Sequence, residues 1–147
     1  MSRIAPVLEE AAPPIPSPDR RLEQYTTPAE EALKIAVHLS SRGHLDETIV
    51  DLAAGTCRLA LAALLAGAPR AVAVDADPRL AGLCMQAARR LDLEGRLQPV
   101  TSWITRGRGP LSRARVIMSN PPWGVWRRGA DWEILSYALS PVSYTHL

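Results

Sequence analysis

The chain has 147 residues, enough for one domain with a buried core and too few for two. It is 47% hydrophobic and 22% charged, as globular proteins are, and none of its apolar runs approaches the roughly 20 residues of a membrane span. The net charge of +2 does not by itself indicate nucleic-acid binding. Arginine outnumbers lysine 16 to one, a bias that we attribute mainly to a GC-rich genome.

The first 19 residues contain five prolines and little apolar periodicity, which predicts a flexible arm with at most one helical turn at residues 7–11. We expect the folded domain to run from residue 20 to residue 139. A helix is predicted from Ala29 to Ser41, because apolar residues recur there at helical spacing. Thr27 and Glu30 have the spacing of a capping box, and Gly43 marks the end of the helix.

Two apolar runs, residues 48–52 and 71–75, predict buried strands with a helix between them from Arg58 to Ala66. A turn of small residues, 53–57, follows the first strand, and Asp75 ends the second. This order is typical of a nucleotide-binding βαβ unit, in which the turn and the helix N-terminus approach the ligand. The acid at the end of the second strand can accept hydrogen bonds from two ribose hydroxyls.

A helix beginning at Pro78 and a weaker strand at residues 97–101 come next, and Pro99 places that strand at an edge of the sheet. A fourth strand at residues 116–119 and a helix from about Asp131 to Leu139 complete the predicted elements. Together they predict an α/β fold with an open, Rossmann-like sheet. Because such a sheet normally has more than four strands, we expect it to be incomplete at the C-terminus and residues 140–147 to be a non-native tail.

The fourth strand ends in Asn120-Pro121-Pro122-Trp123. The two prolines stiffen the backbone, so the Asn120 amide oxygen and the Pro121 carbonyl form two fixed acceptors suited to an NH₂ group. Trp123 adds a flat face on which a planar ring can stack. With the nucleotide-binding unit, this pattern predicts S-adenosylmethionine as cofactor and an amino nitrogen as methyl acceptor, with no metal.

The combined motifs resemble those of the small-subunit ribosomal RNA N6-adenosine methyltransferases of archaea and eukaryotes. The resemblance runs from about residue 22 to residue 139 and rests on the motifs Leu22-Glu23-Gln24-Tyr25 with Thr27, Asp51-Leu52-x-x-Gly55-Thr56, Asp75, Asn120-Pro121-Pro122-Trp123-Gly124 and Asp131. It implies a class I methyltransferase fold, an RNA substrate and a small zinc-binding activator subunit as partner.

The resemblance also assigns site residues. Asp51 would anchor the methionine end of the cofactor. Substrate contacts would come from Asn120, Pro121, Pro122 and Trp123. The cofactor-binding residues would be Gln24, Thr27, Asp51, Ala53, Gly55, Thr56, Asp75, Ala76, Ser102 and Trp103.

This chain departs from the family pattern at three points. Ala53 and Cys57 stand where glycines are usual, and Cys57 puts a Cβ where the backbone needs a close approach or a left-handed conformation. Ser102 replaces the acid that follows the third strand and faces the adenine. The later strands of the sheet are missing.

Cys57 and Cys84 have no histidine or cysteine at ligand spacing, so no metal site is predicted. The N-terminus, with Glu9 and Glu10, does not resemble a signal peptide, and we therefore expect reduced thiols and a cytoplasmic location.

Three other functions stay open at this stage. A protein glutamine N5-methyltransferase would use the same Asn-Pro-Pro-aromatic motif, although the Leu-Glu-Gln-Tyr segment favours RNA. DNA adenine methylation is a weaker option. A non-catalytic, truncated cofactor-binding module would explain Cys57, Ser102 and the missing strands.

Overall fold

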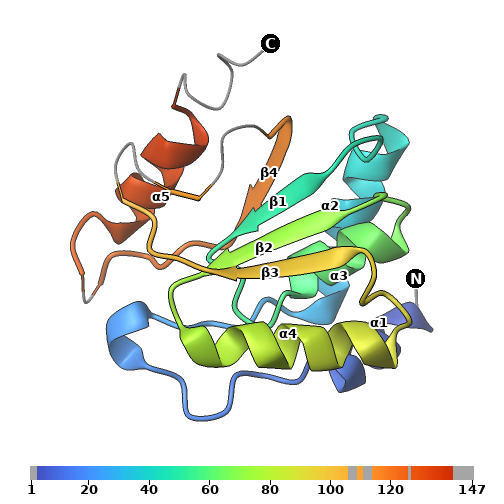
Figure 1. Cartoon of the computed structure of the whole chain (residues 1–147), viewed down its shortest axis with the longest axis horizontal. Helices are drawn as coiled ribbons and strands as arrows, with labels where there is room; N and C mark the ends of the chain where they lie inside the picture. The colour runs from blue at the N-terminus through green and yellow to red at the C-terminus, as the bar shows by residue number, and fades with distance from the viewer. Residues whose placement is uncertain (1–2, 106–108, 111–113, 126, 141–147) are drawn as a thin grey trace.

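The computed structural model describes residues 3–105, 109–110, 114–125 and 127–140. The predicted tail beyond Ser140 lies outside the described residues. Four strands form one sheet: β1 (Ile49–Leu52), β2 (Ala71–Asp75), β3 (Leu97–Thr101) and β4 (Val116–Ser119). All pairs are parallel, and the order is β3-β2-β1-β4 (Figure 1). The predicted α/β fold class is therefore confirmed.

The order of the strands places the site. The chain runs outward from β1 through β2 to β3 and then returns to add β4 on the other side of β1. Ligands of open parallel sheets bind at such a switch point, beyond the carboxyl ends of the strands. Leu52 of β1 is in register with both Val74 of β2 and Ser119 of β4, so the segments after these strands emerge side by side. The Ser119 hydroxyl donates a hydrogen bond to the Leu52 carbonyl at 2.7 Å and ties the two ends together.

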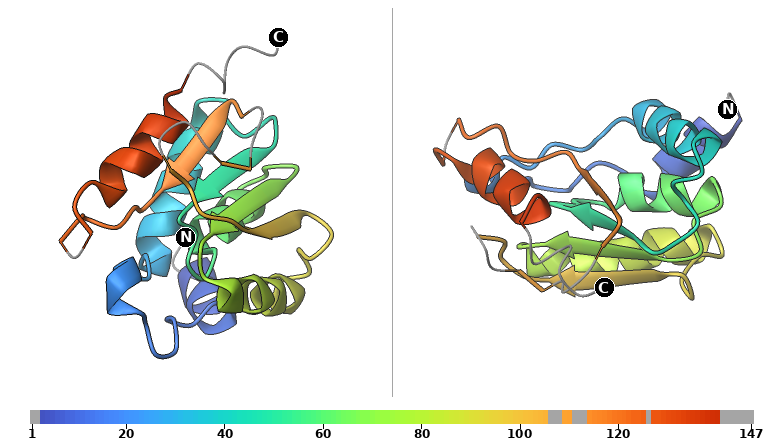
Figure 2. Two further views of the ribbon diagram at one scale, coloured as in Figure 1. Left: turned by 60° about the vertical axis from the view of Figure 1, so that its left-hand side comes forward. Right: turned by 90° about the horizontal axis from the view of Figure 1, so that it is seen from above.

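Helices cover both faces of the sheet. The helices α1 (Ile4–Ala11), α2 (Ala29–Ser41), α3 (Arg58–Leu65) and α4 (Pro78–Arg90) enclose the larger core. On the opposite face lies α5 (Ala130–Ala138), which packs through Ile134 and Tyr137 and stands apart from the other helices in Figure 2. Successive side chains of a strand point to opposite faces of the sheet. In β2, Ala71 and Ala73 therefore face the larger core, whereas Val74 faces the core beneath α5.

The edge position predicted for the third strand is confirmed, because β3 pairs only with β2. Pro99 lies within β3, where its lack of an N–H is tolerated on the unpaired side. Within the described residues, no helix combines the length and apolar character needed to cross a membrane.

The prediction of a flexible N-terminal arm is wrong. Residues 4–11 form α1, and the side chains of Leu8, Ala12 and Ile15 are buried against the rest of the protein. The helix packs on α2, α3 and α4. Most of the prolines that led to the prediction of a flexible arm lie after this helix, in the connection to the 3₁₀ turn η1 (Arg20–Leu22).

The boundaries of α2 agree with the prediction, and Gly43 has the left-handed φ of +69° that ends a helix. The predicted capping box is wrong. The Ala29 N–H donates instead to Glu9 Oε2 of α1 at 3.2 Å, and Thr27 Oγ1 accepts a bond from a distant residue, Asn120. Tertiary contacts have replaced the local cap.

The prediction of two reduced thiols is also wrong. Cys57 and Cys84 form a disulfide with a Cα–Cα distance of 5.6 Å. The bond joins Cys57, the residue immediately before α3, to Cys84 in the middle of α4. Both helices pack on the same face of a parallel sheet, so the fold brings together two cysteines whose spacing in the sequence carries no signal.

Candidate active site

A cavity lies at the carboxyl ends of the strands, where open parallel sheets bind their ligands. Its walls come from three regions: the N-terminal segment, the turns after the four strands, and α5 with the loop before it. The lining residues are Ile15, Arg21, Leu22, Glu23, Gln24, Tyr25, Ala53, Gly55, Val74, Asp75, Ala76, Ser102, Trp103, Ile104, Asn120, Pro122, Arg127, Ala130, Glu133 and Ile134.

The turn after β1 has an unusual backbone. Ala53, Gly55 and Cys57 all have positive φ, of 56°, 56° and 64°. The left-handed conformation expected at Cys57 is therefore present. Each non-glycine residue in this region costs on the order of 1–2 kcal/mol. The surroundings hold the strained turn, because the Ala54 N–H donates to Val74 O at 3.1 Å and the disulfide anchors Cys57.

Asp75 at the end of β2 organises the centre of the cavity. Its Oδ2 accepts from the Gly55 N–H at 2.9 Å, and its Oδ1 accepts from the Asp77 N–H at 3.0 Å. Burial raises the pKa of the Asp75 carboxyl, and these two backbone bonds oppose the rise. The carboxylate thus fixes the turn after β1 against the turn after β2 and faces the cavity between them.

Asp51 lies beneath the cavity. It is 0% exposed, and its Oδ2 accepts from the Ala60 N–H in the first turns of α3 at 3.0 Å. Burial raises the pKa of Asp51 to about 8. Among the described residues neither Asp51 Oδ1 nor the buried Thr56 Oγ1 has a hydrogen-bond partner. Two orphaned oxygens beside a turn that faces a cavity fit a cofactor with an amino group to donate.

The Gln24 side chain lines the cavity, but its amide is committed elsewhere. Its Oε1 accepts from the Asp19 N–H at 2.7 Å, and its Nε2 donates to Asp77 Oδ2 at 2.7 Å. The Arg79 guanidinium, which hydrogen-bonds to Asp77, lowers the pKa of that carboxyl to about 2. Gln24 therefore fastens the N-terminal segment to the start of α4.

Asn120 follows β4 and faces the cavity. Its Nδ2 donates to Thr27 Oγ1 at 3.1 Å, which fixes the orientation of the amide. Among the described residues, no hydrogen bond to Asn120 Oδ1 is found. Pro122 also lines the cavity, whereas Trp123 lies outside it with a side chain that is 73% exposed.

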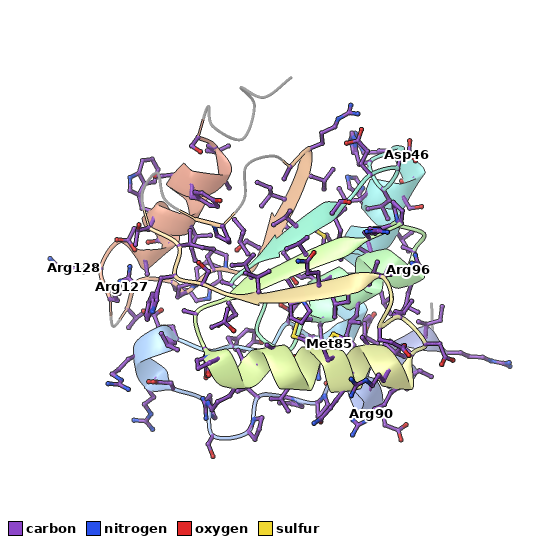
Figure 3. The ribbon with its side chains drawn as sticks, in the orientation of Figure 1. Asp46, Met85, Arg90, Arg96, Arg127 and Arg128 are labelled. Carbon is purple, nitrogen blue, oxygen red and sulfur yellow. A yellow bond between two sulfur atoms is a disulfide. The ribbon has the colours of Figure 1, made fainter. Side chains whose placement is uncertain are left out.

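The far wall carries Ser102 and Trp103. The Ser102 N–H donates to Asp75 O at 2.9 Å, so the backbone of β3 continues along the site. The Trp103 ring stacks under the Arg127 guanidinium, 5.5 Å from the ring centroid, and Arg127 also pairs with Glu133 of α5. Arg127 and Arg128 both lie at the carboxyl end of the sheet (Figure 3).

The structure brings most of the predicted site residues to one cavity. Those that line it are Gln24, Ala53, Gly55, Asp75, Ala76, Ser102, Trp103, Asn120 and Pro122. Thr27, Asp51, Thr56, Pro121 and Trp123 do not line it. Thr27 hydrogen-bonds to Asn120, Asp51 belongs to β1, and Thr56 belongs to the turn after β1, with the side chains of Asp51 and Thr56 buried.

Two important residues were not predicted. Asp77 supports both Gln24 and α4, and its position directly before Pro78 is an N-cap pattern that could have revealed it. Arg58 is buried at the start of α3 and contacts α1 and Thr27. No pattern in the sequence distinguishes it from the other arginines.

Comparison with known proteins places this architecture among methyltransferase-like folds. No family model matches the chain. It is 28% identical over 131 residues to the uncharacterised protein MJ0284 of Methanocaldococcus jannaschii, covering 84% of this chain and 59% of that protein. The chain thus spans less than two thirds of this relative.

Two solved structures show the fold. The first is described as a "putative RNA methyltransferase", PH1948 from Pyrococcus horikoshii, with a TM-score of 0.79, 25% identity, and coverage of 93% of this chain and 67% of that one. The second is the Trypanosoma brucei PRMT1 enzyme–prozyme complex with AdoHcy, with a TM-score of 0.51, 18% identity, and coverage of 61% and 28%. The chain therefore has the Rossmann-like fold of class I, S-adenosylmethionine-dependent methyltransferases.

Proposed function

We propose that this chain is the cofactor-binding part of an S-adenosylmethionine-dependent methyltransferase that modifies N6 of adenine in RNA, with ribosomal RNA as the substrate. One observation carries the proposal. The Thr27–Asn120 hydrogen bond orients the side-chain amide of a residue that lines the same cavity as the Asp75–Gly55 pair. An acceptor for an amine and a nucleoside site thus share one cavity.

The residues present fit S-adenosylmethionine. Asp75 can accept from the ribose hydroxyls, and the positive φ of Gly55 lets the cofactor approach the backbone. Asp51 Oδ1 and Thr56 Oγ1, which have no hydrogen-bond partner among the described residues, would serve the methionine end from behind the cavity wall. Trp103 and Ile104 offer an apolar wall for the adenine. When bound, the cofactor supplies an electrophilic methyl group on a sulfonium.

Asn120 and Pro121 would act on the methyl acceptor. The lone pair of an exocyclic amine is delocalised into its ring, so the amine is a poor nucleophile. Hydrogen bonds from its two N–H groups to Asn120 Oδ1 and to the Pro121 carbonyl would hold the nitrogen and draw it towards tetrahedral geometry. The stiff Pro121-Pro122 backbone then serves alignment, which supplies much of the rate enhancement in such transfers.

Three observations support RNA as the substrate. Trp123 is an exposed ring beside the site, suited to stack on a base that has left its helix. PH1948, which is 25% identical to this chain over the aligned part, is described as a "putative RNA methyltransferase". Arg128, exposed in the same loop, is placed to contact phosphate. A small zinc-binding activator subunit and a cytoplasmic location are part of the proposal.

The test is transfer of labelled methyl groups from S-adenosylmethionine to a mixture of small-subunit ribosomal RNA and ribosomal protein. We expect label in the RNA, recovered as N6-methyladenosine after digestion to nucleosides, and its loss in Asn120→Ala. Label in glutamine side chains would instead establish the protein N5-methyltransferase. Cofactor binding without any transfer would establish the non-catalytic module.

A further inference from the structure

Arg58 is a buried cation with two hydrogen-bond acceptors and one ion-pair partner. It is the first residue of α3, and it is 3% exposed. Its Nε donates to Ala12 O at 2.7 Å, its Nη1 donates to Thr27 O at 3.0 Å, and its Nη2 lies 2.8 Å from Glu9 Oε1. Buried arginines without such partners are rare because desolvation of the charge is costly.

The two hydrogen-bond acceptors are the ends of a single loop. Residues 12–27 leave α1 at Ala12 and return at Thr27, and one guanidinium holds both ends at the start of α3. The loop contributes Ile15 and residues 21–25 to the cavity wall. In Figure 1 it passes below the carboxyl ends of the strands, with η1 at its outer end.

Further contacts close the loop from its base to its tip. The Ile15 N–H donates to Thr26 Oγ1 at 3.3 Å near the base. The Asp19 N–H donates to Gln24 Oε1 at 2.7 Å near the tip. These bonds hold the loop to itself, and the Gln24–Asp77 bond at 2.7 Å holds the tip to α4. Among the described residues, Arg58 is the one whose hydrogen bonds join both ends of the loop to α3.

We propose that Arg58 is a positioning residue that closes this loop over the cavity and thereby orients the substrate-binding amide. Arg58 holds the Thr27 carbonyl, and the Thr27 hydroxyl holds Asn120. Loss of the guanidinium would remove the donor to two carbonyls and the ion-pair partner of Glu9, and would free the loop at its base. The link to methyl transfer rests on the proposed function, whereas the control of the loop does not.

Arg20 and Arg21 make the loop testable by limited trypsin digestion, because both are exposed in η1. Cleavage there requires local opening, and cleavage after Arg89 or Arg90 at the end of α4 provides an internal reference. The ratio of the two rates separates opening of the loop from unfolding of the whole chain.

The variants are Arg58→Lys and Arg58→Gln. Lysine keeps the charge beside Glu9 but has a single donor atom, which cannot reproduce the fork that reaches Ala12 and Thr27. Arg96 provides the matched control. It also donates to backbone carbonyls, those of Pro69, Leu64 and Ala68, but it lies at the opposite end of the sheet (Figure 3).

We expect the ratio of loop cleavage to α4 cleavage to rise about tenfold or more in both Arg58 variants and to stay unchanged in Arg96→Lys and Arg96→Gln. S-adenosylmethionine, added as the ligand, should suppress loop cleavage in the wild type and bind about tenfold more weakly to Arg58→Lys. A wild type that does not bind it would count against the proposed function, while the cleavage ratio would still decide the role of Arg58.

An unchanged ratio in a folded Arg58→Lys would overturn the inference, as would an equal rise in the Arg96 variants. If both Arg58 variants fail to fold while both Arg96 variants fold, Arg58 maintains the core and not the loop, and the inference is rejected.

Discussion

The side-chain amide of Asn120 donates to the hydroxyl of Thr27 across 93 positions of sequence, at 3.1 Å. The bond joins the turn after β4 to the segment that precedes α2. Thr27→Val keeps the shape of the side chain and removes the acceptor. We expect the turnover number for methyl transfer to fall roughly 10- to 100-fold, because a small misplacement of a positioning group has effects of this size. The affinity for S-adenosylmethionine should change less than threefold.

Thr26→Val is the matched control for this prediction. The Thr26 hydroxyl accepts from the Ile15 N–H, and among the described residues no hydrogen bond joins it to Asn120, so turnover should fall much less. Equal losses of turnover in the two variants, or a loss in Thr27→Val that lies entirely in cofactor affinity, would contradict the assigned role of the Thr27–Asn120 bond.

The buried Asp51 carboxyl should make the free energy of unfolding depend on pH. Burial raises its pKa to about 8 in the folded protein, from an ordinary value of 3.8. The folded state therefore holds the proton more tightly than the unfolded chain. Stability should decrease as the pH rises from about 4 to about 8, by at most about 1.4 kcal/mol per pH unit for this one group.

Asp51→Asn resembles the protonated acid and should flatten that profile, with the largest gain in stability near the upper end of the range. Urea unfolding across the range measures it. Asp46→Asn, at an exposed position, should leave the profile as it is in the wild type. The prediction fails if Asp51→Asn retains the wild-type slope.

RNA binding by variants of Trp123 and Trp132 distinguishes stacking on a base from mere exposure of a tryptophan ring. Both rings are largely exposed, at 73% and 57%, but only Trp123 adjoins the Asn-Pro-Pro turn. Stacking on a base contributes about 1–3 kcal/mol, so Trp123→Ala should weaken RNA binding roughly 5- to 100-fold. Its free energy of unfolding should change by no more than about 0.5 kcal/mol. Trp132→Ala should bind small-subunit ribosomal RNA as the wild type does, and similar losses in the two variants would remove the distinction.

The Cys57–Cys84 disulfide closes a loop across a sequence separation of 27. Crosslinks of this kind stabilise proteins by about 2–4 kcal/mol, and we expect Cys84→Ser to lower the free energy of unfolding by about that amount. The intact mass of protein prepared without reductant should be lower by two hydrogen atoms than that of the reduced protein. Two freely alkylated thiols in the native protein would contradict the pairing.

Much of the fold could be predicted from the sequence, because the signals were local. The apolar runs of β2 and β3 and the periodicity of α2 gave the observed boundaries. Pro99 indicated an edge strand because proline has no N–H to donate to a second neighbouring strand. The small-residue turn and Asp75 were recognised as one unit because the crossover between parallel strands fixes their relative placement.

The errors concern contacts between distant segments. The order of residues 4–15 depends on burial of Leu8 and Ile15 against helices that follow later in the chain. The Thr27 hydroxyl does not cap α2, because it accepts a hydrogen bond from Asn120 instead. The disulfide forms because α3 and α4 pack on the same face of the sheet. Arg58 carried no signal at all, because its three partners meet only in the folded protein.

The most direct test of the central claim is calorimetric titration of S-adenosylmethionine into the chain, beside Asp75→Ala and Glu94→Ala. Asp75 faces the cavity and holds Gly55, whereas Glu94 is exposed in the connection between α4 and β3. We predict saturable binding by the wild type and by Glu94→Ala. The affinity of Asp75→Ala should be at least about tenfold weaker, because that variant loses two charge-assisted hydrogen bonds to the ligand. Absence of binding by a folded wild type, or equal affinities in all three proteins, would contradict the claim that this cavity is the cofactor site.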